Sequence, residues 1–154
     1  MDCTFNTPEG KFNLRVGAVI TDGSRVLVGK DSRVDFYTVI GGRVKLGETA
    51  EAAILREIRE ETGVSAEIDR LYSIGEKFFR FDGIAYHELE FLFLIKPFDV
   101  SLINETAIQC DGADQRLVWL DSTKEPDMPV FPEHLFEAVN SPATELRFIT
   151  VNEP

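Results

Sequence analysis

Apolar, β-branched residues are concentrated in short runs along the first part of the chain. Two such runs, 14–20 and 26–28, flank the sequence Thr-Asp-Gly-Ser at 21–24. Asp and Gly tolerate the backbone angles of tight turns, so this arrangement predicts a β-hairpin. A further short strand is expected over 36–40, ending where the chain reaches a Gly-Gly pair at 41–42.

The segment 49–62 changes to a helical pattern. It is rich in Ala, Glu, Leu, Ile and Arg and contains neither Gly nor Pro, which predicts an α-helix. Gly63 follows directly and can adopt the left-handed conformation that ends many helices. On a helical wheel with about 100° per residue, Ile54, Leu55 and Ile58 share one arc that can face a core.

Two longer apolar runs, 71–81 and 84–95, flank an Asp-Gly pair at 82–83. This dipeptide is favoured in two-residue hairpin turns because its residues tolerate positive φ. In such a hairpin, paired residues have numbers that sum to 165. We therefore expect Phe78 to pair with His87, Phe79 with Tyr86, and Lys77 with Glu88.

The last third of the chain contains shorter elements. The segment 97–115 is mixed and polar and is expected to be a loop, followed by a strand at 116–120. A short helix is expected at 132–139, with Pro132 in its first turn, and a last strand at 146–151.

Length and composition indicate one folded unit. A chain with 154 residues, 44% hydrophobic content and 12 Phe can bury one sizeable core, so we expect a single domain spanning 1–154. Two isolated cysteines, Cys3 and Cys110, are typical of ordinary thiols in a reducing compartment. The N-terminal segment 1–11 has no long apolar run, which indicates neither a secretory signal nor a membrane span. We expect a cytoplasmic protein with no membrane partner.

The formal net charge of −11 restricts the partners. Proteins that bind extended DNA or RNA normally carry an excess of Lys and Arg, so we expect no extended nucleic acid as partner. An acidic protein can bind a small phosphorylated substrate when divalent cations neutralise the carboxylates and the phosphates together.

Three carboxylates, Glu57, Glu60 and Glu61, lie within an arc of about 100° on the predicted helix. They repel one another, and the last two lie near the negative end of the helix dipole, at a cost of a few tenths of a kcal/mol each. An isolated Glu-x-x-Glu-Glu is most often a solvated acidic face. Clustered carboxylates also suit hard cations such as Mg²⁺ or Mn²⁺, which coordinate oxygen.

The surrounding residues favour the metal. Gly42 is followed after five residues by Glu48, and after seven more by the sequence Arg-Glu-Ile-Arg-Glu-Glu-Thr-Gly-Val at 56–64. This segment resembles the signature of the Nudix hydrolase family, G-x5-E-x7-R-E-U-x-E-E-x-G-U with U aliphatic, at every specified position. The resemblance implies an α/β (α+β) fold in which helices sandwich a mixed β-sheet. It also implies Mg²⁺-dependent cleavage of the pyrophosphate bond in a nucleoside diphosphate linked to another group, X.

The resemblance also assigns roles to individual residues. The resemblance implies that the catalytic metal ligands are Glu57, Glu60 and Glu61. Alternatively, Glu57 or a downstream carboxylate acts as the catalytic base. Arg56 and Glu48 are the implied pair that supports the helix. The Gly41 carbonyl is a further implied ligand, although Ile40 stands where the family often has Pro. The acidic residue that completes the site remains open among Glu88, Glu105, Asp111 and Asp114.

The second hairpin offers candidates for substrate binding. Arg80 has a planar guanidinium that matches phosphate oxygens, but a solvated strand Arg is an equal alternative. Phe79, Tyr86 and His87 are further candidates, although packing is favoured over substrate binding for all three. Nothing selects X, and a homodimer remains open. The alternatives to a hydrolase are a non-catalytic, nucleotide-sensing module with this fold and an isomerase; the intact carboxylates argue against the first.

Overall fold

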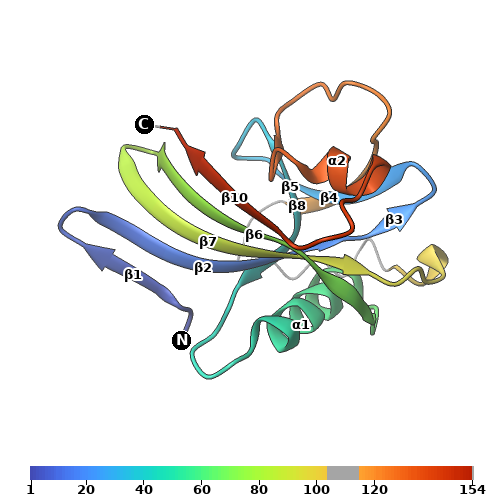
Figure 1. Cartoon of the computed structure of the whole chain (residues 1–154), viewed down its shortest axis with the longest axis horizontal. Coiled ribbons are helices and arrows are strands. Elements are labelled where there is room, and N and C mark those ends of the chain that lie inside the picture. Colours follow the sequence, from blue (N-terminus) through green and yellow to red (C-terminus); the bar gives the residue numbers. More distant parts are fainter. Residues whose placement is uncertain (104–114, 154) are drawn as a thin grey trace.

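The computed structural model describes residues 1–103 and 115–153. These residues form a mixed β-sheet with few helices, an α+β arrangement that confirms the predicted fold class. The elements in chain order (Figure 1) are β1 (Thr4–Thr7), β2 (Gly10–Val19), β3 (Thr21–Asp22), β4 (Arg25–Asp31), β5 (Tyr37–Arg43), α1 (Ala50–Thr62), β6 (Ile68–Phe81), β7 (Ile84–Ile95), the 3-10 helix η1 (Val100–Leu102), β8 (Gln115–Asp121), β9 (Val130–Phe131), α2 (Leu135–Asn140) and β10 (Arg147–Asn152).

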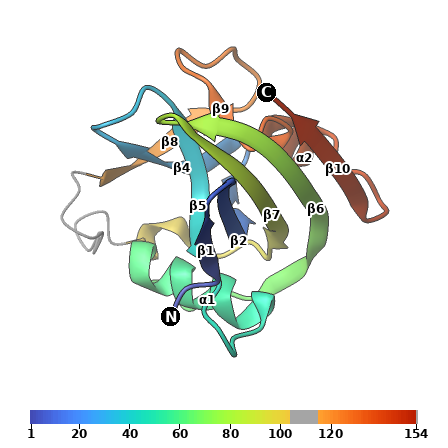
Figure 2. The ribbon, with the colours of Figure 1, turned by 90° about the vertical axis from the view of Figure 1, so that its left-hand side faces the viewer.

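The sheet has the strand order β10-β6-β7-β2-β5-β4-β3, with β1 beside β2, β8 beside β4 and β9 beside β5. Strand β2 lies at its centre, parallel to β7 and antiparallel to β5. Figure 2 shows β6 and β7 curving strongly, with α1 across one side of the sheet and α2 on the other. The functional signature therefore lies on a helix packed against the central strands.

The two faces of the sheet bury separate cores because successive residues of a strand point to opposite sides. On one face, Ile54 and Ile58 of α1 pack in a cluster with Val16 of β2. On the other face, Leu135 of α2 packs in a cluster with Val19 of β2. The helix, sheet and helix layers agree with the expected sandwich.

Local signals define α1 at both ends. The side chain of Thr49 accepts a hydrogen bond from the Ala52 amide at 3.1 Å, which caps the first turn. Gly63 has φ of 79° and donates its amide to the Arg59 carbonyl at 2.9 Å. The predicted helix and its glycine cap are confirmed.

The second hairpin also forms as predicted. Asp82 and Gly83 have φ values of 51° and 77°, and the register pairs Phe78 with His87 and Phe79 with Tyr86. Strand β6 begins at Ile68, three residues earlier than expected, and register shifts interrupt its first part. The two-residue turn alone is sufficient to set the register beyond these irregularities.

The first hairpin differs from the prediction. Thr21 and Asp22 of β3 pair with β4, and the Leu27 amide donates to the Ile20 carbonyl at 2.9 Å, but β2 itself pairs with β5 and β7. Residues 16–19 of β2 are buried, so this strand suits a central position between two partners. The helix predicted at 132–139 begins three residues later in the structure, because α2 starts at Leu135. The Leu135 amide donates a hydrogen bond to the Pro132 carbonyl at 3.0 Å.

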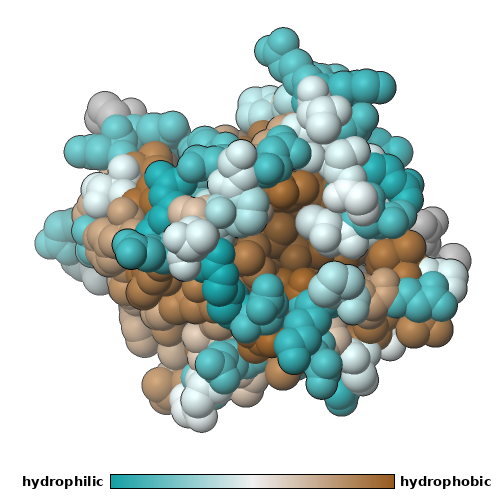
Figure 3. All heavy atoms as spheres, turned by 45° about the vertical axis from the view of Figure 1, so that its right-hand side comes forward, coloured by the Kyte–Doolittle hydropathy of each residue, from teal (hydrophilic) through white to brown (hydrophobic). Residues whose placement is uncertain are grey.

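Some large apolar side chains remain exposed, and Figure 3 shows brown, apolar surface between teal, hydrophilic groups. These side chains come from several separate elements rather than from one helix. Within residues 1–103 and 115–153, no helix is long and apolar enough to cross a membrane. The exposed set comprises Met1, Phe5, Leu46, Phe81, Ile84, Leu102, Leu146 and Phe148.

Candidate active site

Two adjacent glycines of β5 let the strand pass very close to its neighbours. A Cβ added to Gly41 would lie 2.0 Å from the Val16 carbonyl oxygen on β2. A Cβ added to Gly42 would lie 2.5 Å from both Cδ and Oε1 of Glu57 on α1. The Glu57 carboxylate therefore lies directly against the backbone of β5, in space that only glycine leaves free.

Arg56 joins the loop before α1 to the helix itself. Its Nε and Nη2 donate to the two carboxylate oxygens of Glu48 at 2.7 and 2.9 Å, a bidentate pair. Nη2 also donates to the Arg43 carbonyl at 3.1 Å. The hydrogen bonds from Arg56 lower the pKa of Glu48 from its ordinary value of 4.5 to about 2. The pair thus ties the loop before α1 to the helix, and its supporting role stays a prediction.

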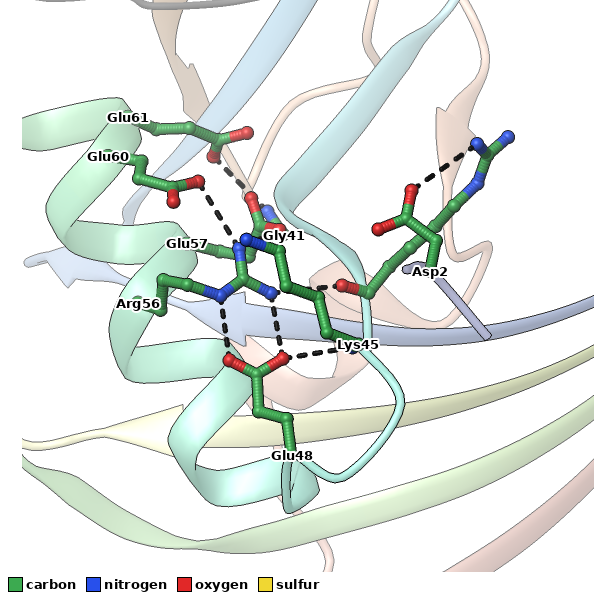
Figure 4. A network of polar contacts seen from close by, with 9 residues as sticks. Asp2, Gly41, Lys45, Glu48, Arg56, Glu57, Glu60 and Glu61 are labelled. Carbon is green, nitrogen blue, oxygen red and sulfur yellow. Dashed lines mark hydrogen bonds and ion pairs between the residues drawn. The ribbon is translucent and has the colours of Figure 1, made fainter. Parts of the chain in front are cut away.

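The same guanidinium reaches the glutamates of the signature. Arg56 Nη1 donates to Glu57 Oε1 at 2.8 Å and lies 3.3 Å from Glu60 Oε2. Figure 4 shows Glu57, Glu60 and Glu61 projecting from α1 toward the strand that carries Gly41, with Arg56 beside them. One cation thus orients two of the three carboxylates.

Glu61 has a different environment. The Gly41 amide donates to Glu61 Oε2 at 3.2 Å. Burial, together with the nearby charge of Glu57, raises the pKa of Glu61 to about 8. Burial is also the main cause that raises the pKa of Glu57. Two neighbouring buried carboxylates disfavour full ionisation unless a proton or a cation compensates their charge.

The donor chemistry of this cluster fits a hard divalent cation, because every acidic group in it is a carboxylate. The described residues contain no group of three His, Cys, Asp or Glu side chains that already converges on one point. Arg56 instead contacts two of the carboxylates, those of Glu57 and Glu60. The Glu60 contact is the longer of the two, and its side chain is 47% exposed, so Glu60 has room to turn toward a cation.

A cleft of about 1480 Å³ opens beside this cluster. Its wall includes parts of α1, β2, β4 and β5, the loop between β4 and β5, the start of β8, and the hairpin end of β6 with its turn. Both acidic and basic side chains line it. The lining residues that carry charge are Asp2, Arg15, Asp31, Arg33, Asp35, Arg43, Lys45, Arg56, Glu57, Glu60, Glu61, Asp82 and Arg116.

The sequence comparisons agree with the signature and the fold. A family model described as the NUDIX domain matches residues 11–138, which is most of the chain. This chain belongs to the Nudix hydrolase family.

Several Nudix relatives match parts of the sequence. A putative 8-oxo-dGTP diphosphatase of Bacillus subtilis (strain 168) is 42% identical over 59 residues, 38% of this chain and 40% of that protein. The RNA pyrophosphohydrolase of Ruthia magnifica subsp. Calyptogena magnifica is 34% identical over 77 residues, 49% and 43% of the two chains. Nucleoside diphosphate-linked moiety X motif 6 of Xenopus laevis is 28% identical over 113 residues, which are 70% of this chain and 52% of that protein. The matches thus span about half or less of these relatives.

Solved Nudix structures share the fold at low sequence identity. The mutator MutT protein of Bacillus halodurans has a TM-score of 0.68 and 19% identity, covering 91% of this chain and 89% of that one. The MutT Nudix hydrolase of Burkholderia pseudomallei has a TM-score of 0.65 and 21% identity, covering 84% and 98%. At such identities the similarity establishes the fold alone.

Several basic residues of the Nudix cleft were missed by the sequence analysis. Arg15 is the clearest, because it interrupts the otherwise apolar run 14–20 and so carried a visible signal. Burial raises the pKa values of Glu57 and Glu61, and the positive charge of Arg15 opposes both rises. The other missed basic residues are Arg33, Arg43, Lys45 and Arg116, for which no local pattern points to a cleft.

The four substrate-binding candidates on the second hairpin lie elsewhere. Phe79 stacks on Tyr86 with ring centroids 5.0 Å apart, and Arg80 is exposed. His87 packs against Phe78 at 4.4 Å, and its Nε2 lies 3.5 Å from Glu76 Oε2. None of these four candidates is among the described residues that line the cleft; the hairpin contributes Phe81 and Asp82 instead.

Of the downstream acidic candidates, the described part of the chain includes only Glu88. Its Oε2 accepts a hydrogen bond from Asn13 Nδ2 at 3.3 Å, and burial raises its pKa. It lies on the strand that also carries Glu90, which pairs with Lys77 at 2.9 Å, and it does not line the cleft. The other candidates, Glu105, Asp111 and Asp114, lie outside the described residues.

Proposed function

We propose that this protein is a Mg²⁺-dependent hydrolase, with Mn²⁺ as a substitute, that cleaves the pyrophosphate bond of a nucleoside diphosphate linked to another group, X. The observation that carries the proposal is the contact of Arg56 with Glu48, Glu57 and Glu60 at the wall of a 1480 Å³ cleft. This charged hydrogen-bond network holds mutually repelling carboxylates beside a cleft. Such carboxylates can bind a cation, and the cation can in turn bind a phosphate group.

The proposed metal ligands are the carboxylates of Glu57, Glu60 and Glu61, with the Gly41 carbonyl as a further ligand. A divalent cation bound there supplies neutralisation of phosphate charge and activation of the attacking water. Family membership supports this assignment, because Nudix hydrolases generally use divalent metal cations.

The protein's own groups perform the remaining steps. Glu57 is the candidate for accepting the proton of the attacking water, as the alternative to its role as a metal ligand, because its carboxylate lies against the β5 backbone at the wall of the cleft. Arg15, Arg43 and Lys45 line the same cleft and supply positive charge for phosphate oxygens. Arg56 keeps the carboxylates in place through its pair with Glu48.

The relatives support the reaction class and leave X open. Their names are putative 8-oxo-dGTP diphosphatase, RNA pyrophosphohydrolase and nucleoside diphosphate-linked moiety X motif 6, and cleavage of a phosphoric anhydride is common to the first two reactions. The net charge of −11 argues for a small substrate rather than extended nucleic acid. We further propose a cytoplasmic protein with one domain spanning 1–154, and gel filtration with light scattering would test for a homodimer.

A hydrolysis screen tests the proposal. The protein is incubated with nucleotide sugars, ADP-ribose, dinucleoside polyphosphates and oxidised nucleoside triphosphates, in Mg²⁺, Mn²⁺ or chelator, and products are identified by mass. We expect one class to release a nucleoside monophosphate or pyrophosphate only with metal. Arg56→Gln should lose activity, whereas Arg59→Gln, exposed on the same helix, should retain it. Activity in chelator would refute the metal, and tight binding without any product would favour the sensor alternative.

A further inference from the structure

The cleft contains an aromatic pair that the proposed hydrolysis does not use. Phe36, in the loop before β5, and Phe81, at the end of β6, both line it, with ring centroids 6.2 Å apart in an edge-to-face arrangement. Phe81 is 46% exposed. An apolar ring exposed within a cleft otherwise rich in charge is available to a planar group of a ligand.

Phe36 packs against a second aromatic side chain in addition to Phe81. Its ring contacts Phe131 of β9 edge-to-face, with centroids 5.3 Å apart. The loop that carries it is also ordered, because the buried Lys30 donates to the carbonyls of Asp31 and Val34. A ring that is already immobilised loses little entropy when a ligand stacks on it.

The position of the pair relative to the glutamates matches an extended substrate. Strand β5 begins directly after Phe36 and passes the glutamates at Gly41, five residues further on. At about 3.3 Å per residue, this separates the aromatic pair from the acidic cluster by roughly 16 Å of strand. A nucleotide separates its base from its diphosphate by a ribose, so it can occupy both ends of such a cleft.

The charges near the aromatic pair favour a base over a second phosphate group. Asp31, Asp35 and Asp82 line this part of the cleft. The charge of Asp31 is compensated by Arg33, whose Nη2 donates to Asp31 Oδ2 at 2.6 Å, so the preference for a base rests on Asp35 and Asp82. Carboxylates accept hydrogen bonds from the N–H groups of a base and repel phosphate.

We propose that Phe36 and Phe81 bind the base of the substrate by stacking, which makes the substrate a nucleotide whose base lies at the aromatic pair and whose diphosphate lies at α1. The inference rests on the proposed function for the position of the diphosphate. Stacking of a base on an aromatic side chain changes affinity about fivefold to a hundredfold.

The test compares two non-hydrolysable probes by calorimetry in Mg²⁺: guanosine 5′-(α,β-methylene)diphosphate and methylenediphosphonate, which has no base. We expect the guanosine probe to bind at least about tenfold more tightly. Phe81→Ala should weaken its binding by about tenfold and leave methylenediphosphonate unchanged, whereas Phe81→Tyr, which keeps a ring, should bind as wild type. Phe36→Leu should act like Phe81→Ala.

Ile84→Ala is the matched control, since Ile84 is 45% exposed beside the same turn and is not among the lining residues. It should leave the affinity for both probes unchanged. Three outcomes would overturn the inference. The two probes bind with equal affinity, the guanosine probe does not bind measurably, or both Phe variants bind the guanosine probe as tightly as wild type. Because binding of these probes needs no hydrolysis, a base-dependent affinity in a protein without turnover would instead contradict the proposed function alone.

Discussion

Replacing Glu48 by Gln should remove a defined and pH-dependent part of the protein's stability. Glu48 accepts two hydrogen bonds from Arg56 and one from the Lys45 amide, and the pKa of its carboxyl falls from 4.5 to about 2. One pH unit of pKa difference between folded and unfolded states corresponds to about 1.36 kcal/mol. The Glu48 charge therefore contributes about 3 kcal/mol to the free energy of unfolding at pH 7, as an upper limit.

The sign of the pH dependence follows from the lowered pKa. The contribution is fully present above the unfolded value of 4.5 and is lost as the pH falls through the folded value of about 2. The same relation leaves about 1.4 kcal/mol at pH 3. The gap in stability between wild type and Glu48→Gln should therefore narrow by about half from pH 7 to pH 3.

Urea denaturation followed by circular dichroism at pH 7, 5, 4 and 3, with chelator present, measures this gap. Glu67→Gln is the control, because Glu67 is exposed between α1 and β6 and its loss should change stability by less than about 0.5 kcal/mol. A gap below about 1 kcal/mol at pH 7, or one that stays constant down to pH 3, would refute the assigned role of the Glu48–Arg56 pair.

Three further predictions concern the carboxylates. Glu57→Gln should lower turnover at least about a hundredfold with the fold retained, measured by steady-state kinetics and circular dichroism. Gly42→Ala should displace the Glu57 carboxylate and cost about a hundredfold in turnover with little loss of melting temperature. In chelator, stability should fall as pH rises from 4.5 to about 8, because folded Glu61 holds its proton more tightly than the unfolded chain. Urea titrations of Glu61→Gln should show a smaller fall; an equal fall would contradict the burial of its charge.

The sequence by itself determined the elements whose signals are local. Helix α1 follows from the composition of 49–62 and from its caps at Thr49 and Gly63, all contained within one short segment. The hairpin of β6 and β7 follows from the Asp-Gly turn. Its two residues of positive φ make a two-residue turn, which determines which residues of the two strands pair. The spacing of the Nudix signature likewise located the acidic cluster, since Glu60 and Glu61 follow Glu57 by three and four residues, which is about one turn of the same helix.

Only the tertiary structure decided which strands lie together and what surrounds the site. Strand β2 takes β5 and β7 as partners, and its apolar pattern is compatible with any buried neighbour. Phe36 and Phe81 meet across the cleft from distant segments, although neither carries a local signal for doing so. The sequence also cannot show that Arg56 contacts both Glu57 and Glu60, because that depends on the chosen rotamers. Long-range pairing and side-chain packing depend on the whole fold, whereas caps and turns depend on a few neighbouring residues.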